Sequence, residues 1–180
     1  MQLWTIQSNG AYQRLQRDGT LSGDRAFIME KSFLPAYQWL CRQMEKRIGP
    51  PPHPDAFPIW AWHTWEGGSG KPDMRRYRSE IEKPGGCWRL TLEVPDDQVL
   101  LSDFDLWHFS LNGWYLALSE KEYKTSSADY KEKSWERIFQ IDLPANDWCV
   151  TEKKSIQATF WTLTWDMVKK AEHFERAAVK

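Results

Sequence analysis

The chain has 180 residues, of which 24 are basic and 25 acidic, so its net charge is close to zero. This length favours one domain with one core, and the balanced charge argues against a protein-wide positive field for non-specific nucleic-acid binding. Three widely separated cysteines and the lack of a basic, apolar leader or a long apolar run argue against a disulfide framework, secretion and a membrane span. We therefore expect a single cytoplasmic domain over residues 1–180.

The N-terminal segment is expected to form a strand followed by a helix. Residues 3–7 suit a short strand, and Ser8 or Asn9 can cap a helix that Gly19 ends. The following loop, residues 19–24, contains two glycines. These permit either a pair of turns or a close approach of the backbone to a ligand.

A second helix and a tryptophan-bearing strand should follow. Ser32 is a candidate cap for the helix, whose apolar residues step by three and four as far as Ile48. The sequence GPPP at residues 49–52 then ends it. Residues 59–65, IWAWHTW, alternate in the manner of a strand.

Residues 66–86 are expected to be a long, mobile loop, because they contain five glycines and two prolines. This segment also contains Arg75, Arg76 and Arg78. Arginine presents a rigid fork of donors to phosphate groups, so the loop could hold a nucleic acid. A disordered surface loop is the alternative, and the sequence leaves both open.

The most regular stretch is residues 90–118. Residues 90–94 alternate apolar and polar, a turn follows, and residues 99–101 return to the core. Ser102 or Asp103 can cap a helix that begins at Phe104. His108 falls on the predicted apolar face, where we expect a core histidine rather than a general base.

The C-terminal part is predicted to contain a strand over residues 155–161 and an amphipathic helix over residues 165–174. Helices and strands therefore mix without the regular alternation of a doubly wound sheet. This pattern indicates an α+β fold in a single domain.

Familiar catalytic motifs are absent from the sequence, including glycine-rich phosphate loops, HExxH and GxSxG. The four histidines lack metal-site spacing, so we expect no metal. Asp103 and Asp105 are better explained by helix capping and the helix dipole than by catalysis. The 12 tryptophans exceed what a core of this size needs, so some could stack on bases, sugars or nicotinamide.

Several stretches carry a resemblance to a known family. The order LWTIQSNGAYQRLQRDGTLSG, PIWAW, VPDDQVLLSDFDLWHFSLNGWYL and IQATFWTL resembles an uncharacterised bacterial and phage domain family across nearly the whole chain. The layout is also similar, more distantly, to the ADP-ribosyltransferases, especially the toxins that modify nucleic acid. That likeness implies a split β-sheet core with flanking helices.

The same resemblance implies a set of site residues. Thr5 falls at the first-strand catalytic position with Gln7 on the same face, Trp60 or Trp62 at the aromatic position of the second strand, and Gln157 where a glutamate is expected. NAD would be the co-substrate, and these three segments should lie side by side and form one pocket. Because a glutamine lacks the charge of a carboxylate, Glu152 and Asp105 are alternative acids.

The resemblance further implies a toxin or phage-defence effector, with RNA, DNA or protein as acceptor and an antitoxin or other regulator as partner. Two non-enzymatic alternatives stand beside it. One is a single-stranded nucleic-acid module, in which exposed tryptophans stack on bases while Arg75, Arg76 and Arg78 hold phosphates. The other is a protein-interaction domain with its tryptophans in the core.

Overall fold

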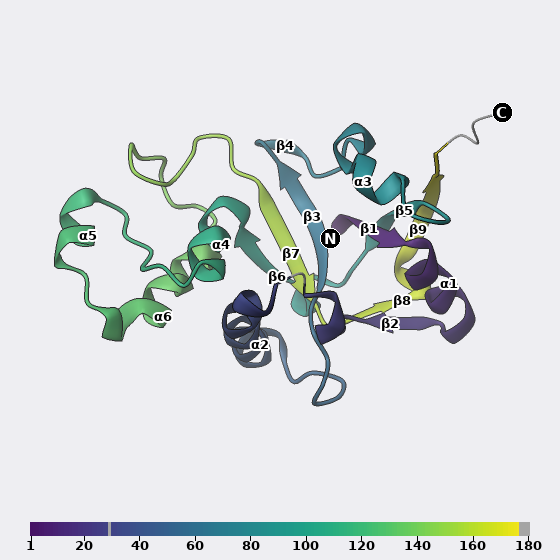
Figure 1. The fold of residues 1–180 in the computed structure, drawn as a ribbon, viewed down its shortest axis with the longest axis horizontal. Helices are drawn as coiled ribbons and strands as arrows, with labels where there is room; N and C mark the ends of the chain where they lie inside the picture. Colours follow the sequence, from purple (N-terminus) through teal and green to yellow (C-terminus); the bar gives the residue numbers. More distant parts are fainter. Residues whose placement is uncertain (29, 177–180) are drawn as a thin grey trace.

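An antiparallel sheet of seven strands runs through the protein, in the order β6-β7-β3-β1-β5-β9 with β4 beside β3. The computed structural model describes residues 1–28 and 30–176 (Figure 1). The strands are β1 (Gln2–Ser8), β3 (Ile59–Trp65), β4 (Gly68–Ser69), β5 (Cys87–Glu93), β6 (Leu100–Asp103), β7 (Ile156–Phe160) and β9 (Val168–Phe174). A second sheet pairs β2 (Thr20–Ser22) with β8 (Thr162–Thr164).

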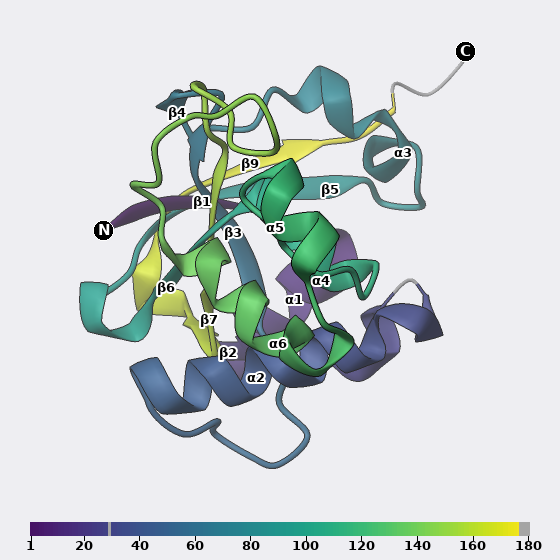
Figure 2. The same cartoon turned by 90° about the vertical axis from the view of Figure 1, so that its left-hand side faces the viewer.

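The large sheet consists of two blocks. One block is β6-β7-β3 and the other is β1-β5-β9, and the pair Trp4–Trp62 joins them. By contrast, β1 and β5 are paired along their full length, from Gln2–Glu93 to Ser8–Cys87. In Figure 2 the strands β1, β5 and β9 run across β3 and β7. The blocks therefore diverge beyond the Trp4–Trp62 pair, which leaves room at the junction.

Helices flank the sheet, so the fold is α+β as the sequence predicts (Figure 1). They are α1 (Asn9–Asp18), α2 (Leu34–Ile48), α3 (Arg78–Ile81), α4 (Phe104–Leu111), α5 (Glu120–Thr125) and α6 (Lys131–Ser134). The Ser8 side chain accepts a hydrogen bond from the Ala11 N–H, and Gly19 ends α1 in the left-handed conformation. Asp103 caps α4 by accepting from the N–H groups of Asp105 and Leu106. These caps are confirmed.

No helix in the described part of the chain has both the length and the apolar character needed to cross a membrane.

Two apolar clusters make up the core. One joins α1 to both strand blocks and includes Leu3, Leu90 and Phe160. The other lies among α2, α4 and the 3₁₀ helix Trp135–Phe139. The second cluster contains four of the tryptophans, at positions 39, 107, 135 and 161. Core packing therefore accounts for much of the tryptophan excess.

The predicted C-terminal helix is wrong. Residues 168–174 form β9, an edge strand that pairs with β5 from Leu92–Val168 to Cys87–Phe174. The apolar residues of this segment fit the spacing of a helix and also that of a strand. The segment forms a strand because it pairs with β5, which is distant in the sequence. Lys169 and Lys170 are exposed on this edge, where charge discourages further strand addition.

Four other local predictions need correction. The loop at residues 19–24 contains β2, and residues 66–86 contain β4, a 3₁₀ helix over Met74–Tyr77 and α3. The helix α2 has Phe33 at its N-cap without a side-chain cap, while the Ser32 hydroxyl donates to Glu30. His108 is exposed rather than in the core, with Nδ1 2.9 Å from the Phe104 carbonyl oxygen. The buried face of α4 is Leu106, Trp107 and Ser110, and it does not include His108.

Candidate functional site: two hollows on either side of β3

A cleft of about 490 Å³ lies where the two strand blocks diverge. We call it the junction cleft. It is lined by the end of β1, one face of α1, β2 and the segment after it, one residue of α2, the start of β3 and the segment before it, and α3 with its following turn. The lining residues are Ile6, Gln7, Ser8, Ala11, Arg14, Leu21, Ser22, Gly23, Asp24, Ile28, Tyr37, Phe57, Pro58, Ile59, Trp60, Glu80 and Lys83.

The wall of the cleft depends on Gly23. Its N–H donates to the Phe57 carbonyl and its own carbonyl accepts from the Phe57 N–H, at 3.0 and 3.1 Å. A Cβ atom at this position would lie 2.5 Å from the carbonyl oxygens of both Phe57 and Pro58. The glycine thus allows a close backbone approach, as its loop suggested, but the approach is to the segment that leads into β3.

A chain of hydrogen bonds fixes Gln7 at the floor of the cleft. The Thr5 hydroxyl donates to the Trp60 carbonyl oxygen at 2.7 Å, and the Gln7 side-chain N–H donates to the Thr5 hydroxyl at 2.9 Å. Thr5 is 1% exposed, so it cannot itself contact a ligand. Its hydroxyl instead ties β1 to β3 and holds the Gln7 amide in place, with the amide oxygen left to accept from a ligand.

Aromatic rings form the opposite wall. Tyr37 and Trp60 meet edge to face with centroids 6.0 Å apart, Tyr37 lies 6.5 Å from Phe57, and Trp107 packs behind both Tyr37 and Trp60. Burial raises the pKa of the Tyr37 hydroxyl, which therefore stays protonated near neutral pH. Among the described residues, the buried Nε1 of Trp60 has no hydrogen-bond partner. Such a buried donor is costly unless a ligand or water satisfies it.

The charges of the cleft balance. Arg14 and Lys83 carry positive charge, and Asp24 and Glu80 carry negative charge. The Lys83 ammonium binds both carboxylate oxygens of Glu80, at 2.6 and 2.8 Å. The cleft therefore presents two cations, a carboxylate held by one of them, an amide and an aromatic wall.

A second hollow of about 350 Å³ lies further along β3, and we call it the aromatic hollow. Trp62 meets Trp65 and Phe104 edge to face, with centroids 4.6 and 5.0 Å apart, and its Nε1 donates to the Tyr77 hydroxyl at 2.8 Å. The Arg76 guanidinium lies 4.9 Å from the Trp65 ring centroid. The lining is completed by Glu66, Lys71, Pro72 and Asp73.

The three arginines predicted to hold phosphates all have carboxylate partners. Arg75 pairs with Asp73 and lowers the pKa of that carboxyl to about 2, and Arg78 pairs with Glu82. Arg76 pairs more loosely with Glu66, at 3.4 Å. Of the three, Arg76 belongs to the lining of the aromatic hollow, whereas the side chains of Arg75 and Arg78 are exposed.

The predicted site residues therefore lie on neighbouring strands but do not line one common pocket. The strands that carry them are neighbours in the order β7-β3-β1, which confirms that the three segments lie side by side. Within residues 1–28 and 30–176, however, the cleft lining includes Gln7 and Trp60 but not Thr5, Trp62 or Gln157. Gln157 pairs in register with Trp62 on one side and Ser102 on the other.

The alternative acids are located elsewhere. Asp105 is exposed in the first turn of α4, and Glu152 lies in the segment of residues 145–152, where it lines a shallow surface hollow. The described part of the chain contains no group of three histidine, cysteine, aspartate or glutamate side chains able to hold a metal ion.

Comparison with known proteins identifies the family. Residues 2–133 match the family described as Domain of unknown function (DUF3841). The chain belongs to this family. No curated protein and no solved structure matches it. The match of this DUF3841 domain covers all residues that line the junction cleft and the aromatic hollow, whereas Gln157 lies beyond it.

Sequence reasoning missed several residues of the junction cleft in this DUF3841 protein, namely Arg14, Tyr37, Phe57, Glu80 and Lys83. One signal was available. Ala11 and Arg14 are three residues apart in α1, which places them on one face of that helix. The remaining residues come from segments that the fold brings together, and no local pattern marks them.

Proposed function

We propose that the junction cleft binds NAD and that the protein is an ADP-ribosyltransferase acting on a nucleic acid, RNA or DNA. The observation that carries the proposal is the composition of one cleft at the divergence of two strand blocks: an aromatic wall, a fixed amide and two cations. The division of the sheet at the Trp4–Trp62 pair also fits the split sheet that the resemblance implies.

The aromatic wall and the amide suit the nicotinamide half of the ligand. A flat, positively charged nicotinamide ring is attracted to the faces of Tyr37 and Trp60 by stacking and cation–π interactions. Its carboxamide N–H groups match the Gln7 side-chain oxygen.

The cations suit the pyrophosphate. Arg14 and Lys83 supply two positive charges for the two negative charges of a dinucleotide pyrophosphate. The ten-residue helix α1 also begins beside the cleft, since Ser8 and Ala11 line it, and the N-terminal end of a helix dipole favours an anion.

Replacing Trp60 tests the proposal. In the wild-type protein, NAD should raise the melting temperature and nicotinamide should be released when RNA, DNA and protein pools are added as acceptors. Trp60→Leu should weaken NAD binding about tenfold or more, because it removes a stacking ring. Isothermal titration and chromatography of nicotinamide measure the two effects.

The matched control is Trp114→Leu, which changes a tryptophan that is 59% exposed and remote from the cleft lining. It should leave NAD binding within twofold of wild type. A wild-type protein that neither shifts its melting temperature with NAD nor releases nicotinamide with any acceptor pool would end the proposal.

The aromatic hollow favours a second candidate function, a non-catalytic single-stranded nucleic-acid module. Exposed faces of Trp65 and Phe104 could stack on bases while Arg76 and Lys71 contact phosphates. The Arg76–Trp65 contact brings a cation and an aromatic face together, which is the combination that such binders use.

Substituting Arg76 tests this candidate. Arg76→Gln should weaken binding to single-stranded DNA and reduce the slope of log affinity against log salt by roughly 0.7, the value for one phosphate contact on a single strand. Arg17→Gln is the control, since Arg17 is exposed and paired with Asp18 far from the hollow. Fluorescence anisotropy at several salt concentrations measures both, and a slope that is the same in the Arg76 variant as in wild type argues against this function.

A further inference from the structure

Cleavage of the bond between nicotinamide and ribose needs a negative group beside the sugar. As the bond breaks, positive charge develops on the ribose, as in glycoside hydrolysis, where carboxylates stabilise the oxocarbenium-like transition state and activate the attacking water. A glutamine at position 157 cannot supply this charge. Under the proposed function, on which this inference rests, the carboxylate must come from the lining of the junction cleft.

Two residues of the described lining carry carboxylates, Asp24 and Glu80. Asp24 is exposed, and its side chain accepts from the Ala26 N–H at 2.8 Å, which caps the short 3₁₀ helix Arg25–Phe27. It also lines two neighbouring surface hollows, so it lies at the mouth of the cleft. Capping of the 3₁₀ helix is therefore a sufficient role for the Asp24 carboxylate.

Glu80 is in a different position. Its side chain is 33% exposed, and it belongs to α3 and lines the same cleft as Gln7, Ser8 and Arg14. Lys83, one turn further along, holds both of its oxygens. The pair presents a carboxylate already oriented by a cation that can itself reach a phosphate.

We propose that Glu80 is the catalytic carboxylate of the junction cleft and that Lys83 exchanges part of its contact with Glu80 for the NAD pyrophosphate. The bond between ribose C1′ and the nicotinamide nitrogen breaks, and its electron pair leaves with neutral nicotinamide. The oxygen of water, or of the acceptor, forms the new bond to C1′, and its proton passes to Glu80. One bond forms, one breaks, and the proton released from the attacking group is accounted for.

Glu80→Gln tests the proposal. It keeps the shape and hydrogen-bonding capacity of the side chain, so the fold and NAD binding should be retained, with a dissociation constant within about threefold of wild type. The rate of nicotinamide release at saturating NAD should fall at least about 100-fold, the lower range for loss of a general base. The comparison uses the full chain with NAD as the probe, in water and with the acceptor pools.

The matched control is Glu82→Gln, a change of the same type two residues away, where the carboxylate pairs with Arg78. It should keep the wild-type rate. If Glu80→Gln retains the wild-type rate, or if Asp24→Asn loses it instead, the inference is overturned while the proposed function stands. If the wild-type protein releases no nicotinamide, the proposed function itself fails.

Discussion

Phe160→Ala should lower the free energy of unfolding by about 3–5 kcal/mol, the range for truncation of a fully buried phenylalanine. Phe160 lies at the end of β7, is 1% exposed and pairs in register with Ile59 of β3. Its ring belongs to the cluster that joins α1 to both strand blocks. Removing it leaves a cavity beneath the start of β3, so the loss combines buried apolar area with lost packing contacts. Urea denaturation followed by tryptophan fluorescence measures the change.

Two further variants make this prediction specific. Phe160→Leu keeps most of the volume and should cost clearly less than Phe160→Ala. Tyr130→Ala removes a ring that is mostly exposed and should change stability by about 0.5 kcal/mol or less. If Phe160→Ala behaves like Tyr130→Ala, the cluster does not hold the two strand blocks together.

Much of the fold follows from local signals in the sequence. Ser8, Gly19 and Asp103 each mark a helix end through a hydrogen bond or a backbone conformation that depends on a few neighbouring residues. The predicted alternation of residues 90–94 is also confirmed, since Leu90, Leu92 and Val94 are buried. These features can be predicted from the sequence because they depend on interactions within one helical turn or one strand.

The errors arise where distant segments decide the outcome. Residues 168–174 and 20–22 have no strong intrinsic preference, and they become strands because β5 and β8 offer them hydrogen-bond partners. The buried face of α4 also differs from the prediction. Ser110 is buried and His108 is exposed, because the interface with α2 and the 135–139 segment overrides simple polarity.

In the candidate site, too, some features could be predicted and others depend on how distant segments pack. The strand order β7-β3-β1 places the predicted residues on neighbouring strands, as the resemblance implied. Which of them share a cavity depends on how the two blocks diverge after the Trp4–Trp62 pair. That divergence turns Trp60 toward the junction cleft and leaves Trp62 at the aromatic hollow. A difference of two residues along one strand thus separates two possible binding sites.

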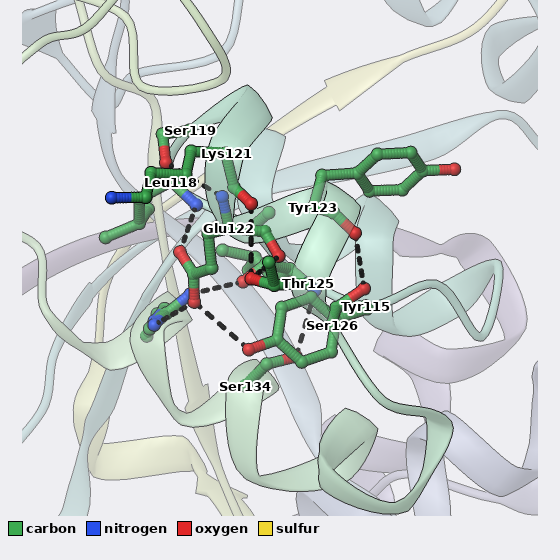
Figure 3. Close-up of polar contacts among 12 residues, drawn as sticks. Tyr115, Leu118, Ser119, Lys121, Glu122, Tyr123, Thr125, Ser126 and Ser134 are labelled. Carbon is green, nitrogen blue, oxygen red and sulfur yellow. Dashed lines mark hydrogen bonds and ion pairs between the residues drawn. The ribbon is translucent and has the colours of Figure 1, made fainter.

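Glu122→Gln should destabilise the protein by about 2 kcal/mol, because Glu122 is the centre of a network that fixes residues 115–137 (Figure 3). Its carboxylate accepts from the Leu118 N–H at 2.9 Å and the Tyr115 hydroxyl at 3.0 Å, and it pairs with Arg137 at 2.6 Å. Arg137 also donates to the Leu116 carbonyl oxygen at 2.5 Å. A neutral amide cannot serve three donors, so the variant leaves Arg137 without its partner charge. Urea denaturation near neutral pH measures the loss.

The same network should make the stability of the protein depend on pH. Burial alone raises the pKa of Glu122, but hydrogen bonds from Arg137, the Leu118 N–H and Tyr115 outweigh burial and hold the pKa below its ordinary value. A carboxyl with a lowered pKa in the folded state stabilises the protein above its unfolded pKa, near 4.3, and this contribution is lost as pH falls through the folded value. Wild type should therefore lose stability from roughly pH 5 downward more steeply than Glu122→Gln. Glu120→Gln, which removes an exposed partner of Lys124, should follow the wild-type curve, so parallel curves for all three proteins would show that Glu122 does not hold this region together.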